Sequence, residues 1–121
     1  MTNRKIGTTS LGLKSLIIDL KKLSTKEKVS MWKRISNDLN MSKRKRREVN
    51  LNKIDKYTRE GEVALVPGKV LSEGQLTKKI TVAGYKFSEK AKQKINKIGR
   101  AISIKELTKE NPKGKKVRII G

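Results

Sequence analysis

The chain has 121 residues, with 32 Lys and Arg against 11 Asp and Glu, and its formal net charge is +21 at pH 7. This length suits a single domain, residues 1–121, and the surplus of positive charge predicts a polyanionic partner. The lack of Cys and His excludes thiolate chemistry and the commonest general base and metal ligand, and no apolar run is long enough for a membrane span or a signal peptide.

Two amphipathic helices are predicted first. Apolar residues recur at three- and four-residue spacing over residues 13–23, after Ser10 as a possible N-cap. The pattern at Ser24–Glu27 is typical of a capping box, and a second apolar stripe over residues 29–39 follows it. We expect the two stripes to pack together as a helical hairpin.

A third, short helix is predicted after the hairpin. Asn50 is its possible N-cap, and Gly61 provides a stop signal. Its apolar side is expected to consist of Leu51, Ile54 and Tyr57.

The second half of the chain changes to the period of strands. Two short strands are predicted over residues 63–66 and 69–71, separated by a Pro-Gly turn. One further strand over residues 80–87 shifts its apolar parity across Gly84, as a β-bulge in that strand would.

A helix is then predicted to connect two strands. Ser88 is its N-cap and Gly99 ends it, and its inward-facing residues are expected to be Ala91, Ile95 and Ile98. A strand over residues 101–104, a helical turn over 104–107 and a terminal strand over 117–120 follow.

These elements predict an α/β fold. We expect a small mixed domain with an N-terminal helical hairpin and basic segment in residues 1–61, followed by short strands with a crossover helix in residues 62–121.

The four aromatic residues are predicted to belong to the core. Trp32 and Tyr57 lie in register with aliphatic helix stripes, which favours packing over base stacking. Tyr85 and Phe87 share one face of the predicted strand, and the glycine-framed signature of an RNA-recognition motif is missing around them.

The densest basic feature is a run of five consecutive cations, residues 43–47. Burial of such a run would cost too much desolvation energy, so we expect it to face solvent or phosphate. The alternative to phosphate binding is that this run is a solvated basic loop or a basic localisation signal. The candidate RNA-binding residues are this run together with three basic pairs elsewhere: Lys43, Arg44, Lys45, Arg46, Arg47, Arg4, Lys5, Lys33, Arg34, Lys78 and Lys79.

No catalytic motif is found. Six residues rather than four separate Gly61 from Gly68, and Val70 stands where a phosphate-binding loop needs Ser or Thr. The carboxylates are scattered among helix caps and partners of basic residues. We expect no enzymatic activity, no cofactor, no metal site and no small-molecule substrate.

Similarity to known proteins is found at residues 17–23, 31–35, 43–54, 66–71, 79–83, 87–88, 101–104, 111–112 and 117–121. Together these stretches resemble one protein family, the archaeal and eukaryotic large-subunit ribosomal protein number eighteen, a relative of the bacterial large-subunit protein fifteen. The resemblance implies a cytoplasmic ribosome component bound to large-subunit rRNA, with a mixed α/β body, a basic N-terminal part and no catalytic or cofactor residues. The short chain is closer to the archaeal type.

The function predicted from the sequence is therefore structural. We expect a constituent of the large ribosomal subunit that orients rRNA helices by neutralising phosphates, next to neighbouring ribosomal proteins. Residues 1–61 hold 17 basic and 6 acidic residues, and residues 62–121 hold 15 and 5, so neither half is a neutral body with a basic tail. The alternative is an architectural DNA-binding protein of the nucleoid, which would share this charge.

Overall fold

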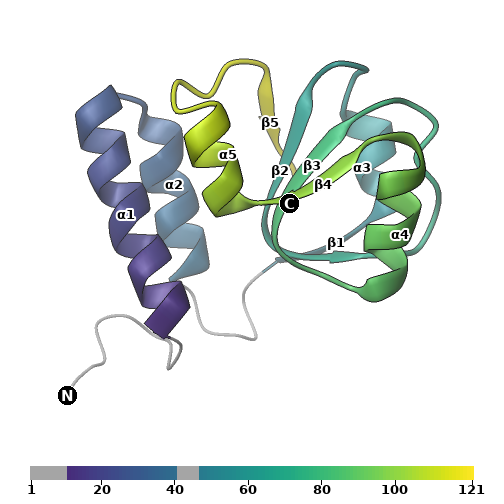
Figure 1. Cartoon of the computed structure of the whole chain (residues 1–121), viewed down its shortest axis with the longest axis horizontal. Coiled ribbons are helices and arrows are strands. Elements are labelled where there is room, and N and C mark those ends of the chain that lie inside the picture. The colour runs from purple at the N-terminus through teal and green to yellow at the C-terminus, as the bar shows by residue number, and fades with distance from the viewer. Residues whose placement is uncertain (1–10, 41–46) are drawn as a thin grey trace.

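The computed structural model describes residues 11–40 and 47–121 (Figure 1). Within them the elements are, in chain order, α1 (Leu11–Glu27), α2 (Ser30–Leu39), β1 (Arg47–Asn50), α3 (Leu51–Tyr57), β2 (Val63–Leu71), β3 (Thr81–Phe87), α4 (Glu89–Ile98), β4 (Arg100–Ser103), α5 (Ile104–Glu110) and β5 (Val117–Ile119). The predicted Ser10 cap lies outside the described residues.

The strands form a parallel sheet in the order β1-β2-β3-β4, and β5 also pairs with β2. One edge of β2 faces β3, and the other edge is shared: β5 pairs with residues 63–65 of β2 and β1 with residues 68–71. The two short strands therefore lie end to end. Gly121, shortly after the end of β5, lies close to this junction. A Cβ placed on Gly121 would lie 2.8 Å from Cδ of Arg47.

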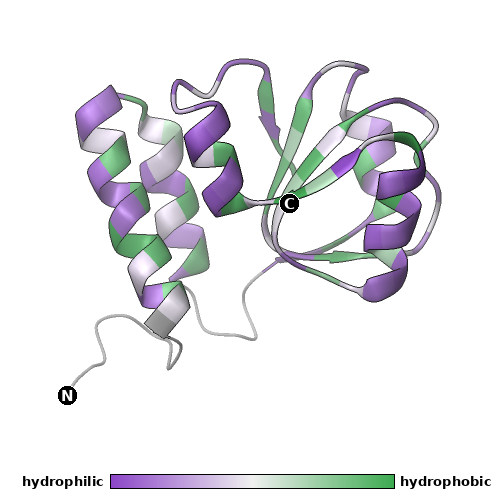
Figure 2. Cartoon of the chain, in the orientation of Figure 1, coloured by the Kyte–Doolittle hydropathy of each residue, from purple (hydrophilic) through white to green (hydrophobic). Residues whose placement is uncertain are grey.

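Helices cover both faces of the sheet, as a parallel sheet requires (Figure 1). On one face, α3 and α4 contribute Leu51, Ile54, Ala91 and Ile95 to a buried cluster. On the other face, α1, α2 and α5 form a second cluster around the fully buried Trp32. Figure 2 shows apolar and polar residues alternating along these helices, which is the pattern of helices with one buried face. The predicted α/β class and helical hairpin are confirmed.

The predicted capping box at Ser24 is wrong, because Ser24 lies within the last turns of α1. The helix ends in a left-handed residue, Lys28, with φ 58°, and the N–H of Val29 donates to the Ser24 carbonyl at 3.2 Å. This six-to-one bond is the Schellman arrangement that closes helix C-termini. The Ser24 hydroxyl donates to the Val29 carbonyl at 2.8 Å, so it fixes the turn between the two helices rather than starting the second.

The two strands predicted around Pro67 are a single strand, β2. A parallel partner lies on each side of it, so no hairpin turn is needed at the Pro-Gly pair. Pro lacks an N–H and is accommodated where strand pairing is irregular. Gly68 lies so close to β1 that a Cβ on it would be 2.0 Å from the Arg47 carbonyl oxygen, which only Gly permits.

The predicted bulge belongs to the neighbouring strand. The register between β2 and β3 shifts after Val66↔Gly84 and resumes at Lys69↔Lys86, so the extra residue lies on β2 and not at Gly84. Gly84 instead sits in tight packing, where a Cβ would meet the Val70 side chain at 3.0 Å.

Helix α4 matches the prediction except at one position, and after it β4 ends at Ser103, before the predicted residue 104, while the predicted turn over 104–107 is a helix, α5, that continues to Glu110. The Ser88 hydroxyl accepts from the Ala91 N–H at 3.2 Å as the N-cap, and Gly99 follows the last residue of α4. Ile98, predicted to face inward, is 38 % exposed in the last turn of α4. The parallel pairing of β3 with β4 confirms the crossover through α4.

Two aromatic predictions are corrected. Tyr85 packs against the cluster that contains Trp32, whereas Phe87 packs against the opposite cluster, so they do not share a face. Tyr57, predicted to be in the core, is 52 % exposed.

Candidate nucleic-acid interface

Acidic side chains connect parts of the fold to one another. Glu27 at the end of α1 lies 2.7 Å from Lys113, Glu110 lies 2.7 Å from Arg100, and Glu62 lies 3.0 Å from Arg118. Asp55 accepts the N–H and the hydroxyl of Thr77, and Glu106 completes a capping box with Ser103 at the start of α5. Much of the scarce negative charge is therefore used within the fold, and within the described residues most Lys and Arg have no acidic partner.

The basic pair of α2 faces solvent. Trp32 and Ile35 are fully buried, and Lys33 and Arg34 between them are exposed because they lie on the opposite side of the helix. The Trp32 indole Nε1 donates to the Pro112 carbonyl at 2.7 Å and anchors α2 to the segment between α5 and β5. The two cations therefore project from a helix whose position is fixed.

The structure describes only one residue of the five-cation run. Arg47 is exposed and opens β1, where its backbone pairs with Gly68. Strand β1 was missed from the sequence because Arg47 and Glu48 break the apolar alternation that marks a strand. Lys43 to Arg46, and the predicted contacts Arg4 and Lys5, lie outside the described residues.

The pair Lys78-Lys79 separates into two different environments. Lys79 is exposed, whereas the Lys78 ammonium donates to the carbonyls of Asp55 at 2.6 Å and Thr58 at 2.9 Å. These carbonyls belong to the C-terminal end of α3, where a cation complements the helix dipole and satisfies free acceptors. Lys94 acts similarly, because its ammonium donates to the carbonyls of Ser72 and Gly74 at 2.9 and 3.0 Å. Sequence reasoning missed both roles, since the partners are backbone atoms far away in the chain.

Further exposed cations lie on both helical layers. In α4 these are Lys90, Lys92 and Lys97, which sequence reasoning did not single out. On the opposite layer, α1 exposes Lys21, Lys22 and Lys26. Figure 2 shows many hydrophilic residues along α4 and α5. The two outer surfaces of the molecule are thus both basic.

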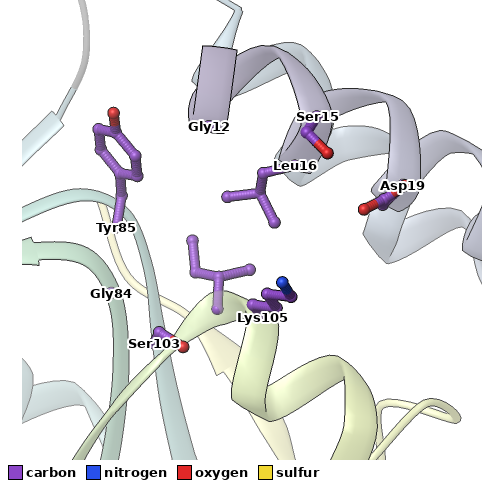
Figure 3. A pocket seen from close by; sticks show the side chains of 9 residues that line it. Gly12, Ser15, Leu16, Asp19, Gly84, Tyr85, Ser103 and Lys105 are labelled. Carbon is purple, nitrogen blue, oxygen red and sulfur yellow. The ribbon is translucent and has the colours of Figure 1, made fainter. Parts of the chain in front are cut away.

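One hollow of about 260 Å³ lies between α1, β3 and the start of α5. Figure 3 shows Leu16 and Asp19 on α1 across the hollow from Lys105 and Ser103. Its lining combines aliphatic side chains with the carboxylate of Asp19 and the ammonium of Lys105. This combination does not indicate a cofactor site. No group of three or more His, Cys, Asp or Glu able to hold a metal ion occurs in the described residues. No helix in that part of the chain is sufficiently long and apolar to span a bilayer.

The ion pair between Glu62, the residue before β2, and Arg118 of β5 is expected to make stability acid-sensitive. Hydrogen bonds from the Arg118 guanidinium, and next from the Arg59 backbone N–H at 2.8 Å, lower the pKa of Glu62 from 4.5 to about 2. A lowered pKa stabilises the fold above pH 4.5, and this stabilisation is lost as the pH falls through about 2.

The Glu62→Gln variant is therefore expected to lose less stability than the parent chain between pH 4.5 and 2. Urea unfolding across this pH range measures the difference. Glu60→Gln, which alters an exposed carboxylate two residues away, is the control. Identical pH profiles for the parent chain and Glu62→Gln would contradict the assignment.

Comparison with known proteins shows similarity over almost the whole chain. The model of a family described as ribosomal protein 60S L18 and 50S L18e matches residues 2–121. A protein of Methanosphaerula palustris is 46 % identical over 121 residues, which cover 99 % of each chain. A protein of Methanococcus maripaludis is 44 % identical over 118 residues, 97 % of this chain and 98 % of its own. A protein of Haloarcula marismortui is 40 % identical over 112 residues, 93 % and 97 %. All three are named large ribosomal subunit protein eL18.

Proposed function

The chain belongs to the family of ribosomal proteins 60S L18 and 50S L18e, and from this premise we propose that it is a structural constituent of the large ribosomal subunit that binds and orients rRNA helices. The resemblance predicted from the sequence is confirmed. The protein is not an enzyme, and its place in the large subunit makes it cytoplasmic. Its partners are large-subunit rRNA and the ribosomal proteins around it.

The observation that carries this proposal is the full-length match to ribosomal relatives. The charge distribution supports it: the net charge is +21, several acidic side chains pair with other parts of the fold, and exposed basic side chains lie on both helical layers. Each phosphate that a Lys or Arg neutralises releases counterions, which provides the affinity. Base edges contribute little in such a mode, because A-form RNA is recognised mainly through its shape and backbone.

The proposed phosphate contacts are the exposed predicted residues and the basic segments outside the described residues. Arg47, Lys33, Arg34 and Lys79 are exposed on three separate elements or loops. We assign Lys78 a supporting role, since its ammonium holds the end of α3. The basic segments are Arg4 with Lys5 and Lys43 to Arg46.

Orientation of RNA requires a rigid connection between the two basic layers. The indole of Trp32 and the Glu27–Lys113 ion pair tie the α1–α2 hairpin to the segment after α5. The Ser36 hydroxyl, which is buried, donates to the Ile17 carbonyl at 3.1 Å and joins α2 to α1. A body joined in this way can contact one RNA helix on each side and hold the two at a defined spacing.

The test compares nucleic acids of equal length. The full chain is expected to bind fragments of large-subunit rRNA more tightly than duplex DNA at about 0.2 M salt, where non-specific binding is weak. Equal affinity for the two would favour the DNA-binding alternative, which none of the comparisons supports. Sedimentation of the chain apart from large subunits in cell extracts would contradict the proposal directly.

A further inference from the structure

Tyr57 is the one aromatic side chain of this protein that is largely open to solvent. All four aromatic residues lie in the described part of the chain; Trp32 is fully buried, and Tyr85 and Phe87 pack against the two core clusters. Tyr57 is 52 % exposed, at the end of a helix whose other apolar residues, Leu51 and Ile54, are fully buried.

Helix geometry explains why Tyr57 points away from the core. Successive residues are rotated by about 100°, so the position that continues the direction of Leu51 and Ile54 is Thr58. Thr58 is 1 % exposed and takes this inward place. Tyr57 is rotated outward by about 60° from Ile54 in the same geometry. The fold therefore places a small polar residue inside and leaves the aromatic ring outside.

The exposed ring lies beside a hollow and among cations. Asn52, Lys53, Lys56 and Tyr57 line an open hollow of about 350 Å³ on the outer side of α3. The ammonium of Lys56 is 5.4 Å from the centre of the Tyr57 ring, within cation–π range. Lys53 and Lys56 are exposed and have no acidic partner in the described residues.

This combination is complementary to an unpaired nucleotide. A flat aromatic surface stacks on any base, and an ammonium beside the ring can neutralise the phosphate of the same nucleotide. An A-form duplex offers neither an accessible base face nor room for a ring, so the surface fits a loop or a bulge rather than paired RNA.

We propose that Tyr57 is a stacking platform for one unpaired base of the large-subunit rRNA, and that Lys53 and Lys56 neutralise its phosphate. The inference rests on the proposed function. It adds one contact with a base to a protein surface whose other proposed contacts are with phosphates. It gives the protein a means to distinguish an unpaired loop or bulge from an RNA helix.

The experiment measures dissociation constants of the full-length chain for three probes at one salt concentration. The probes are deproteinised large-subunit rRNA, a single-stranded oligouridine dodecamer and an RNA duplex of the same length. The variants are Tyr57→Ala, Tyr57→Phe and, as matched control, Ile18→Ala, which removes another exposed apolar side chain, 43 % exposed, from α1. Far-UV circular dichroism verifies that each variant is folded.

Tyr57→Ala is expected to weaken dodecamer binding by about fivefold to a hundredfold, as loss of one stacked base does, and to leave duplex binding within about twofold of the parent chain. Tyr57→Phe and Ile18→Ala are expected to bind the dodecamer like the parent chain. Equal dodecamer affinities for Tyr57→Ala and Ile18→Ala, or a loss in Tyr57→Phe as large as in Tyr57→Ala, would overturn the stacking site but not the proposed function. Failure of the parent chain to bind rRNA would overturn both.

Discussion

Replacement of Lys43, Arg44, Lys45, Arg46 and Arg47 together by Gln is expected to reduce the slope of log affinity against log salt for rRNA by about 3.5 to 4.5. Each phosphate contact contributes roughly 0.7 to 0.9 to this slope through counterion release. The Gln variant is therefore expected to bind rRNA orders of magnitude more weakly than the parent chain at low salt. This difference in affinity is expected to become smaller as the salt concentration rises. Filter binding of large-subunit rRNA over a salt series measures both quantities.

A charge-preserving variant provides the control. Replacement of only Arg44, Arg46 and Arg47 by Lys keeps all five charges, so the slope is expected to remain while any two-pronged Arg contact is lost. The fold is expected to tolerate both changes at Arg47, since its side chain is exposed and it pairs with Gly68 through backbone atoms. An unaltered slope in the Gln variant would remove this segment from the interface.

Trp32→Ala is expected to lower the free energy of unfolding by about 3–5 kcal/mol. The side chain is fully buried among residues of α1, α2 and α5, and its removal leaves a large cavity in the cluster. The Pro112 carbonyl also loses the indole donor that holds it at 2.7 Å. Domains of this size have only about 5–15 kcal/mol of stability, so the variant is expected to lie near the limit of folding.

Urea unfolding followed by far-UV circular dichroism measures this loss, because Trp32 is the only Trp and its fluorescence disappears in the variant. Trp32→Phe retains an aromatic ring in the cluster but not the hydrogen bond, and an intermediate loss is expected. Ile18→Ala, at an exposed position of α1, is expected to change stability by less than about 0.5 kcal/mol. A Trp32→Ala chain as stable as Ile18→Ala would show that the hairpin is not held to the sheet through this residue.

The helices were predictable because their apolar residues follow a local period. Leu13, Ile17 and Leu20 of α1 are buried as the spacing indicates, and Ser88 caps α4. The errors arise where the deciding contact is distant in sequence. The Pro67-Gly68 pair resembles a turn, and only the approach of β1 shows that it belongs to a continuous strand.

The same distinction applies to the candidate interface. Exposure of Lys33 and Arg34 follows from the buried neighbours Trp32 and Ile35 in the helical period. The engagement of Lys78 could not be predicted, because its partners are carbonyls 20 and 23 residues away. Tyr57 was misplaced by a single position at a helix end, where Thr58 fits the core direction better.

The shared outer edge of β2 has a consequence for folding during synthesis. Residue 68 pairs with residue 47, so one part of this edge is paired with a strand that is synthesised earlier. Residue 63 pairs with residue 117, so the other part can be paired only after a strand 54 residues downstream has been synthesised. Such distant parallel pairing is slow, because a long loop must close first. Until the ribosome has released that downstream strand, the nascent chain carries an open β edge, the kind of surface on which chaperones act and aggregation begins.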